Sequence, residues 1–326
     1  MIKSVYQTEG SLIGTDENNR YISSLEGLEE AMREGRILEA AAIGCSGKLE
    51  LCVELGDHVG TIERDEAVLN LGGEETKDIA VITRVGKPVC FKVISIEKKK
   101  VGDVKIKLSR RLAQLECATN YLAGLRAGDV IPAKITHLEH FGAFADIGCG
   151  IISLLSIDCI SVSRISHPKD RLRQGSELAV VIKSIEKDES GLPVRIYLSR
   201  RELLGSWEEN ASRFSAGQTV AGIVRSIESY GIFVELAPNL AGLAEYRPDV
   251  AVGQTAAVYI KSIIPERMKL KLVIVDSYKG IPPRHLRSDF EDGDYIPDHI
   301  SHWKYSPECC KRVVETVFDT DTQPSY

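Results

Sequence analysis

The feature that most constrains this chain is a short motif that occurs twice, about ninety residues apart. The first copy runs from His140 to Ile147 and the second from Ser229 to Leu236. Both read aromatic, Gly, small or aliphatic, Phe, aliphatic, acid, aliphatic. A run rich in β-branched residues precedes each copy, and a Gly with an apolar strand follows it. Because the flanks recur with the motif, the chain is predicted to contain a repeated structural module.

The two aromatics of each copy are spaced so that a regular strand would point them to opposite faces. Gly142 and Gly231 lie between the aromatics, and Gly is the residue that most easily accommodates a β-bulge. One bulged residue there would bring Phe141 and Phe144 onto one face, and the same holds for the second copy. The core side would then be formed by Ala143, Ala145, Ile147, Ile232, Val234 and Leu236. The alternative, in which all four aromatics fill the core, stays open.

Two exposed aromatics on a small antiparallel barrel form a stacking platform for nucleic-acid bases. The sequence here resembles the ribosomal protein S-one type RNA-binding domain, which is an OB-fold barrel. The matching stretches are Gly128 to Val130, Phe141 to Ile147, His167-Pro168, Gly175, Val181 to Glu186, and Arg195 to Ser199. Taken whole, the chain is similar to the multi-repeat ribosomal protein S-one homologues of Gram-positive anaerobes.

We therefore expect a mainly β protein, with tandem five-stranded OB-fold barrels joined by short linker helices and a small irregular C-terminal tail. The expected parts are an N-terminal segment with a short helix (1–35), a degenerate barrel (36–111), a linker helix (112–127), an RNA-binding barrel (128–201), a second linker helix (202–215), a shorter RNA-binding barrel (216–276) and the tail (277–326). Residues 1–22 are polar and are predicted to be loosely held. Trp207, on an apolar helical stripe, is predicted to pack between domains.

In the second barrel, the resemblance implies RNA contacts at Phe141, Phe144, Ser156, Arg164 and Arg195. The two Phe rings would stack on bases, and Arg195 would stack on a base or bind phosphate. Ser156 stands where the family often has a His, and it can donate a hydrogen bond but cannot stack. Arg164 belongs to a basic segment that either contacts phosphate or is solvated surface. The other cations of this segment are Lys169, Arg171 and Arg173.

In the third barrel, Tyr230 and Phe233 keep the aromatic pair, and Lys269 matches the position of Arg195. Arg225, on the first strand, is expected to help. Glu245 stands at the family's His position and puts an acid near the expected phosphates. We expect this barrel to carry a second, weaker RNA-binding face. In the first barrel the aromatic pair is replaced by Leu49 and Cys52, which indicates protein contact or a structural remnant.

The net charge of −6 limits how strongly RNA can be bound by charge. Residues 281–326 hold nine acids and five bases, whereas residues 128–276 are close to neutral, with eighteen acids and seventeen bases. Stacking must therefore supply more of the affinity than phosphate contacts do. We expect a modest affinity and a modest dependence on salt.

The sequence does not favour a membrane, secreted, disulfide-linked or metal-binding protein. No apolar run is long enough to span a membrane, and the first residues lack the apolar core of a signal peptide, so we expect a cytoplasmic protein without a membrane partner. The eight cysteines are scattered without a Cys-x-x-Cys pair, which is typical of reduced thiols. The C-terminal His and Cys residues fit no standard metal site: His285, His299, His302, Cys309 and Cys310. We expect no catalytic residue, metal, cofactor or small-molecule substrate.

The favoured hypothesis is a protein that binds single-stranded RNA, expected to be mRNA, and that supports translation at the small ribosomal subunit, as the resemblance implies. An RNA chaperone or post-transcriptional regulator that acts away from the ribosome is the first alternative. The second alternative is a protein–protein scaffold that binds no RNA.

Overall fold

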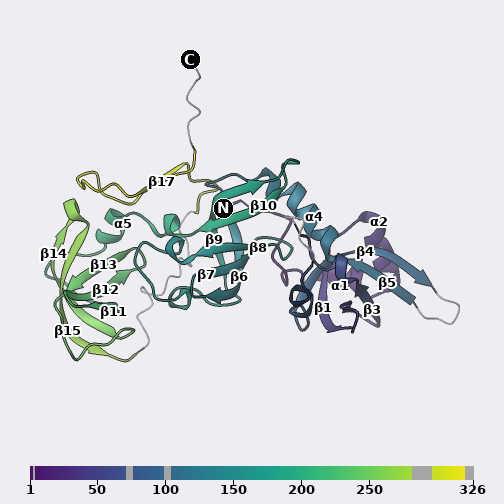
Figure 1. Ribbon diagram of the computed structural model, residues 1–326, viewed down its shortest axis with the longest axis horizontal. Coiled ribbons are helices and arrows are strands. Elements are labelled where there is room, and N and C mark those ends of the chain that lie inside the picture. Colours follow the sequence, from purple (N-terminus) through teal and green to yellow (C-terminus); the bar gives the residue numbers. More distant parts are fainter. Residues whose placement is uncertain (3, 71–75, 99–103, 281–295, 320–326) are drawn as a thin grey trace, which may run out of the picture.

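Three small β-barrels lie in a row along the long axis of the molecule, with the second in the middle (Figure 1). The structure is a computed structural model that describes residues 1–2, 4–70, 76–98, 104–280 and 296–319. Each barrel is closed by five strands in the same order: first, second, third, fifth and fourth along the chain. The predicted mainly β fold of tandem OB-fold barrels is therefore confirmed.

The strand bounds are as follows. The first barrel comprises β1 (Leu38–Cys45), β2 (Leu51–Leu55), β3 (His58–Ile62), β4 (Pro88–Lys98) and β5 (Val104–Ser109). The second comprises β6 (Val130–Glu139), β7 (Gly142–Asp146), β8 (Ile152–Ser156), β9 (Glu177–Lys187) and β10 (Pro193–Ser199). The third comprises β11 (Thr219–Glu228), β12 (Gly231–Ala237), β13 (Leu240–Ala244), β14 (Thr255–Ile264) and β15 (Lys269–Tyr278).

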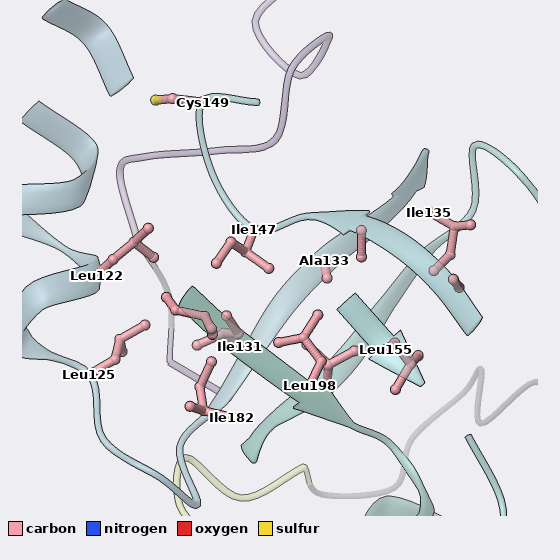
Figure 2. Packing of buried hydrophobic residues seen from close by; sticks show 14 of the residues in the cluster. Leu122, Leu125, Ile131, Ala133, Ile135, Ile147, Cys149, Leu155, Ile182 and Leu198 are labelled. Atoms are coloured by element: carbon pink, nitrogen blue, oxygen red, sulfur yellow. The ribbon is translucent and has the colours of Figure 1, made fainter. Parts of the chain in front are cut away.

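Alternate residues of the strands fill each barrel, because successive side chains of a strand point to opposite faces. In the second barrel Ile131, Ala133 and Ile135 of β6 meet Leu155 of β8 and Leu198 of β10 (Figure 2). The expected core positions of both motif copies are buried: Ala143, Ala145, Ile147, Ile232, Val234 and Leu236. The alternation of the sequence therefore predicts correctly which side of the two motif strands, β7 and β12, faces inward.

Helices join the barrels, as predicted, but they are shorter than their expected ranges. Helix α4 (Arg110–Asn120) begins at Ser109, whose hydroxyl accepts a hydrogen bond from the Leu112 N–H at 2.8 Å. A 3-10 turn follows, and its Leu122 packs on the core of the second barrel (Figure 2). The second linker contains a 3-10 turn (Arg201–Leu204) followed by α5 (Trp207–Ala211).

The N-terminal residues are held firmly, so the prediction that residues 1–22 are loosely held is wrong. Glu9 is buried and binds Arg110 of α4 through both carboxylate oxygens, at 2.6 and 3.0 Å. The backbone N–H of Glu9 donates to Asp146 of the second barrel at 2.7 Å. This one residue therefore ties the N-terminal segment to α4 and the second barrel.

Three further helices lie in the first part of the chain: α1 (Asp16–Ile22), α2 (Leu25–Glu34) and α3 (Asp78–Ile82). Helix α2 begins at Ser24 and ends at Gly35, which has the left-handed conformation that favours glycine. Leu28 and Ala31 of α2 are buried in the core of the first barrel. The predicted short N-terminal helix therefore packs on that barrel.

The C-terminal segment links the second and third barrels. Its short strands β16 (His302–Lys304) and β17 (Glu315–Val317) pair with each other, and Trp303 and Tyr305 pack with Trp207 in the core of the third barrel. Just before them, the Ile300 N–H donates to the Gly128 carbonyl of the second barrel at 2.8 Å. Trp207 thus packs between the third barrel and the C-terminal segment, in agreement with the prediction that it packs between domains.

The described residues contain no helix that is long and apolar enough to cross a membrane. Within the same part of the chain, no group of three or more His, Cys, Asp or Glu side chains is placed to hold a metal ion. His299 contacts Asp129 at 2.7 Å, and His302 contacts Glu315 at 2.9 Å. His285 lies outside the described residues.

Candidate nucleic-acid interface

The aromatic pair of the second barrel is placed by the hairpin that joins β6 to β7. Glu139 pairs with Gly142, so His140 and Phe141 form the two-residue turn between them. Phe141 is 56% exposed at this turn, and Phe144 is half-buried on β7. Their ring centroids are 6.0 Å apart at an interplanar angle of 87°. The two rings thus meet edge to face on the outside of the barrel.

The third barrel repeats this geometry. Glu228 pairs with Gly231, which leaves Ser229 and Tyr230 in the turn. Tyr230 is 67% exposed, and its ring centroid lies 6.1 Å from that of half-buried Phe233, at 88°. The prediction that each pair shares one face is therefore confirmed. The hypothesis that all four aromatics fill the core is wrong for Phe141 and Tyr230.

The sequence predicts bulges at Gly142 and Gly231, but the bulges lie on the strand that precedes each aromatic turn. The register shifts between Ile135 and His137 on β6, and between Val224 and Ser226 on β11. The glycines have another role, because a Cβ on Gly142 would lie 2.5 Å from the Leu155 carbonyl oxygen. A Cβ on Gly231 would likewise lie 2.5 Å from the Ala244 carbonyl oxygen. Both glycines let the strand that follows the aromatic turn lie close to its neighbour.

Two further rings belong to the face of the second barrel, and the predicted site did not include them. His137 is paired with Phe144 across the hairpin and stacks on it, with centroids 6.5 Å apart. On the other side, Phe144 is paired with Leu154, and Leu154 with Tyr197 of β10. Tyr197 is signalled in the sequence by its position two residues after Arg195, which places both on the same face of one strand.

Phe144, Leu154 and Tyr197 thus form a row of cross-strand partners on three neighbouring strands. The corresponding row of the third barrel is Phe233, Leu243 and Lys271. Lys271 thus takes the place of Tyr197, and Lys269 takes that of Arg195. Arg195, Lys269 and Lys271 are all exposed. The predicted match between Arg195 and Lys269 is therefore confirmed by strand register. The third barrel has a cation where the second has a ring.

The first barrel has no ring in this row, which reads Cys52, Thr61 and Lys107. Lys107 Nζ forms an ion pair with Glu63 Oε1 at 2.8 Å. The register also agrees with the prediction that Cys52 replaces the second aromatic of the motif. This barrel therefore lacks the stacking surface that the other two present.

Ser156 and Arg164 have different surroundings. The Ser156 hydroxyl donates a hydrogen bond to Asp158, and this bond is the main cause that lowers the pKa of the Asp158 carboxyl. The Ser156 hydroxyl proton is thus already donated to Asp158, a side chain of the same barrel. Arg164 is exposed in the connection between β8 and β9.

Arg225 does not lie open on the third face, and the expectation that it contacts RNA is corrected. Its Nε donates to the Glu235 Oε2 at 2.7 Å, and its side chain is only 11% exposed. Arg171, from the basic segment of the second barrel, is also buried and donates to the same carboxylate at 2.6 Å. Both arginines neutralise Glu235 at the contact between two barrels. Long-range pairing of this kind leaves no local mark in the sequence.

These observations define a class of protein: tandem OB-fold barrels, two of which present paired aromatics at the same hairpin beside exposed cations. Residues 125–196 match the family model of the S1 RNA binding domain. The second barrel therefore matches that family, which confirms the resemblance seen in the sequence.

About two thirds of the chain is similar to small ribosomal subunit proteins of Gram-positive bacteria. It is 26% identical to the small ribosomal subunit protein bS1 homolog of Bacillus cereus, over 67% of this chain and 56% of that protein. It is 30% identical to the small ribosomal subunit protein bS1 of Staphylococcus saprophyticus, over 65% of this chain and 61% of that protein. The chain thus spans little more than half the length of these curated relatives.

A crystal structure of a multidomain protein with nucleic acid binding domains from Streptococcus pneumoniae also aligns with this chain. The alignment covers 77% of this chain and 76% of that one, at 14% identity and a TM-score of 0.23. A score this low does not relate the arrangement of the barrels in the two proteins.

Proposed function

We propose that this protein binds single-stranded RNA by stacking bases on the aromatic pairs of its second and third barrels. The observation that carries the proposal is the exposure of Phe141 and Tyr230 at equivalent hairpin turns. Singly scattered exposed rings are common, but an exposed ring packed on a second ring at the same place in two barrels supports an interaction surface. Base stacking on such a ring is worth about 1–3 kcal/mol per base and tolerates any sequence.

The rest of the face supports the same ligand. Arg195 and Lys269 are exposed at matching positions on the two faces, and they are the side chains that we propose contact the sugar-phosphate backbone. The second face is the stronger of the two, because it adds Tyr197 and His137 and belongs to the matched family. The third face has fewer rings and carries Glu245, which is exposed.

The relatives supply the finer part of the proposal. They are named as small ribosomal subunit proteins, so we assign this chain a role in holding mRNA at that subunit in the cytoplasm. The first barrel, which lacks the stacking row, is then the part that contacts other proteins. An RNA-binding role away from the ribosome is the alternative, and co-sedimentation with small subunits distinguishes the two.

The test is fluorescence anisotropy of a labelled, unstructured RNA with the wild type and two double variants. Phe141→Ala with Phe144→Ala removes the second face, and Tyr230→Ala with Phe233→Ala removes the third. The first variant is expected to weaken binding by at least about 30-fold, because two stacked bases, at about 1–3 kcal/mol each, lose their partners. The second is expected to weaken binding less.

The control is Tyr278→Ala, since Tyr278 is 49% exposed at the end of β15 far from Lys269. It should bind RNA as the wild type does. Circular dichroism must show that the barrels of every variant are folded. Wild-type protein that binds no RNA, or folded face variants that bind it equally well, would sink the proposal and favour a protein scaffold.

A further inference from the structure

The connection between β8 and β9, residues 161–174, lies between the two aromatic faces and contacts the surroundings of both. It belongs to the second barrel, and its middle forms a 3-10 turn at Pro168–Asp170. Asp170 accepts hydrogen bonds from the Ser166 and His167 N–H groups, at 3.1 and 3.3 Å. These bonds fix the turn, so the side chains around it have defined positions.

On one side the connection reaches the hairpin that carries Phe141. The ring of His167 meets the ring of His140 edge to face, with centroids 4.8 Å apart. His140 is the neighbour of Phe141 in the same two-residue turn. The start of the connecting turn therefore lies directly beside the aromatic pair of the second barrel.

On the other side the connection reaches the strand that carries Phe233. Arg171 donates to both carboxylate oxygens of Glu235, and also to the Pro238 carbonyl at 3.0 Å. Glu235 follows Phe233 by two residues on β12, so both side chains leave the same face of the strand. Asp170 adds a contact to Arg225 at 3.9 Å. The end of the turn therefore lies beside β12 of the third barrel, two residues along the strand from Phe233.

The exposed charges of the connection are positive. Arg164, Lys169 and Arg173 are exposed, whereas its one acid, Asp170, is half-buried and already accepts two backbone hydrogen bonds. The hairpin of the third barrel has the opposite balance, with Glu228 and Glu245 exposed near Tyr230. The connection thus attracts phosphates more strongly than the hairpin of the third barrel does.

We propose that the two aromatic faces and the connection between them form one continuous track for a single RNA strand. In this arrangement Lys169, Arg173 and Arg164 bind the phosphates of the nucleotides that pass from one barrel to the other. The inference rests on the proposed function and adds a phosphate site between the barrels to it. Because Arg171 and the C-terminal segment hold the two barrels together, both faces engage one strand with little loss of chain entropy.

The test compares short and long RNA by anisotropy, using oligouridylates of about 6 and about 20 nucleotides, since one OB-fold covers about 4–16 nucleotides. The variant is Lys169→Glu with Arg173→Glu. Its matched control is Lys48→Glu with Lys105→Glu, which reverses two exposed cations of the first barrel. Wild type should bind the long strand at least about 100-fold more tightly than the short one.

The charge reversal should weaken binding of the long strand at least about tenfold and leave that of the short strand within about twofold. It should also lower the salt slope for the long strand by about 1.4, the value expected for two lost phosphate contacts. The control should change neither. Equal effects on both strands, or none, would overturn the continuous track while RNA binding itself stands. A wild type that binds neither strand would overturn the proposed function as well.

Discussion

At the scale of single residues, the two aromatics of each pair have different roles. Phe141 and Tyr230 sit in two-residue turns and are mostly in water, so they contribute little to folding. Phe144 and Phe233 are half-buried on strands and hold the first ring in place by edge-to-face contact. The exposed ring therefore offers a surface, and the half-buried ring orients it.

A buried acid of the first barrel contributes to the expected pH dependence of stability. Glu39 accepts hydrogen bonds from the Gly10 and Leu12 N–H groups, both at 2.9 Å. Burial is the main cause that raises the pKa of Glu39 to about 7, and the nearby Glu9 and Asp146 raise it further. The folded chain thus favours the protonated, neutral form of Glu39 more than the unfolded chain does. The resulting stabilisation of the folded state is complete at a pH below the pKa that Glu39 has in the unfolded chain, about 4.5.

That contribution is lost as the pH rises from about 4.5 to about 7. Glu39→Gln keeps an acceptor oxygen without the charge, so it should stabilise the protein above pH 7 by up to about 3 kcal/mol and leave it unchanged near pH 4. Urea unfolding of both proteins across this range measures the difference. Glu54→Gln, at an exposed site, should show no such trend; a pH-independent effect of Glu39→Gln would contradict this account.

At the scale of elements, the close approach at the aromatic hairpin depends on Gly142. Its added Cβ would meet the Leu155 carbonyl oxygen at 2.5 Å and the Ser156 Cα at 3.0 Å, and both are backbone atoms that cannot turn away. Gly142→Ala should therefore lower the free energy of unfolding by about 1–3 kcal/mol and weaken RNA binding, because β7 carries Phe144. Thermal unfolding and anisotropy give the two values.

Gly124→Ala is the matched control, since a Cβ at Gly124 would meet nothing within 4 Å. This variant should keep both its stability and its RNA affinity. If Gly142→Ala were as stable as this control, the packing ascribed to the hairpin would be wrong.

The elements that could be predicted from the sequence are those with a local pattern. Alternation of apolar residues predicts the strands, and the recurrence of the aromatic motif predicts that the second and third barrels have equivalent faces. The bulges were misplaced because the turn at His140 and Phe141 already brings the rings together, so no irregularity is needed at Gly142. Turn length is set by strand pairing, which the motif alone does not specify.

At the scale of the whole molecule, the arrangement of the barrels depends on contacts between distant residues. Glu9 with Arg110 joins the N-terminal segment to α4, and Arg171 with Glu235 joins the second and third barrels. The sequence places Arg171 in a basic segment that either contacts phosphate or is solvated surface, because its buried partner Glu235 lies far along the chain. Single-sequence patterns report local periodicity and carry no signal for such pairs.

The contact between the second and third barrels makes its own prediction. Arg171→Met removes the guanidinium from a carboxylate that is fully buried and leaves it only Arg225. Breaking a buried ion pair in this way typically lowers the free energy of unfolding by about 3–5 kcal/mol. Because Arg225 still pairs with Glu235, we expect a loss near the lower end, about 3 kcal/mol. Denaturation measures the loss, and small-angle scattering should show a more variable spacing of the barrels.

The matched control is Arg173→Met, two residues away and exposed. It should change neither stability nor scattering. An Arg171→Met protein with the scattering curve of the wild type would show that the C-terminal segment alone fixes the two barrels.

The central claim, that RNA lies on the paired aromatics, is tested most directly by photo-cross-linking. A single-stranded RNA containing 4-thiouridine is irradiated with the full chain, and the cross-linked peptides are identified by mass spectrometry. The account predicts cross-links in the peptides that carry Phe141 and Phe144, and fewer in those that carry Tyr230 and Phe233. Cross-links found chiefly in the first barrel, whose row has no ring, would contradict it.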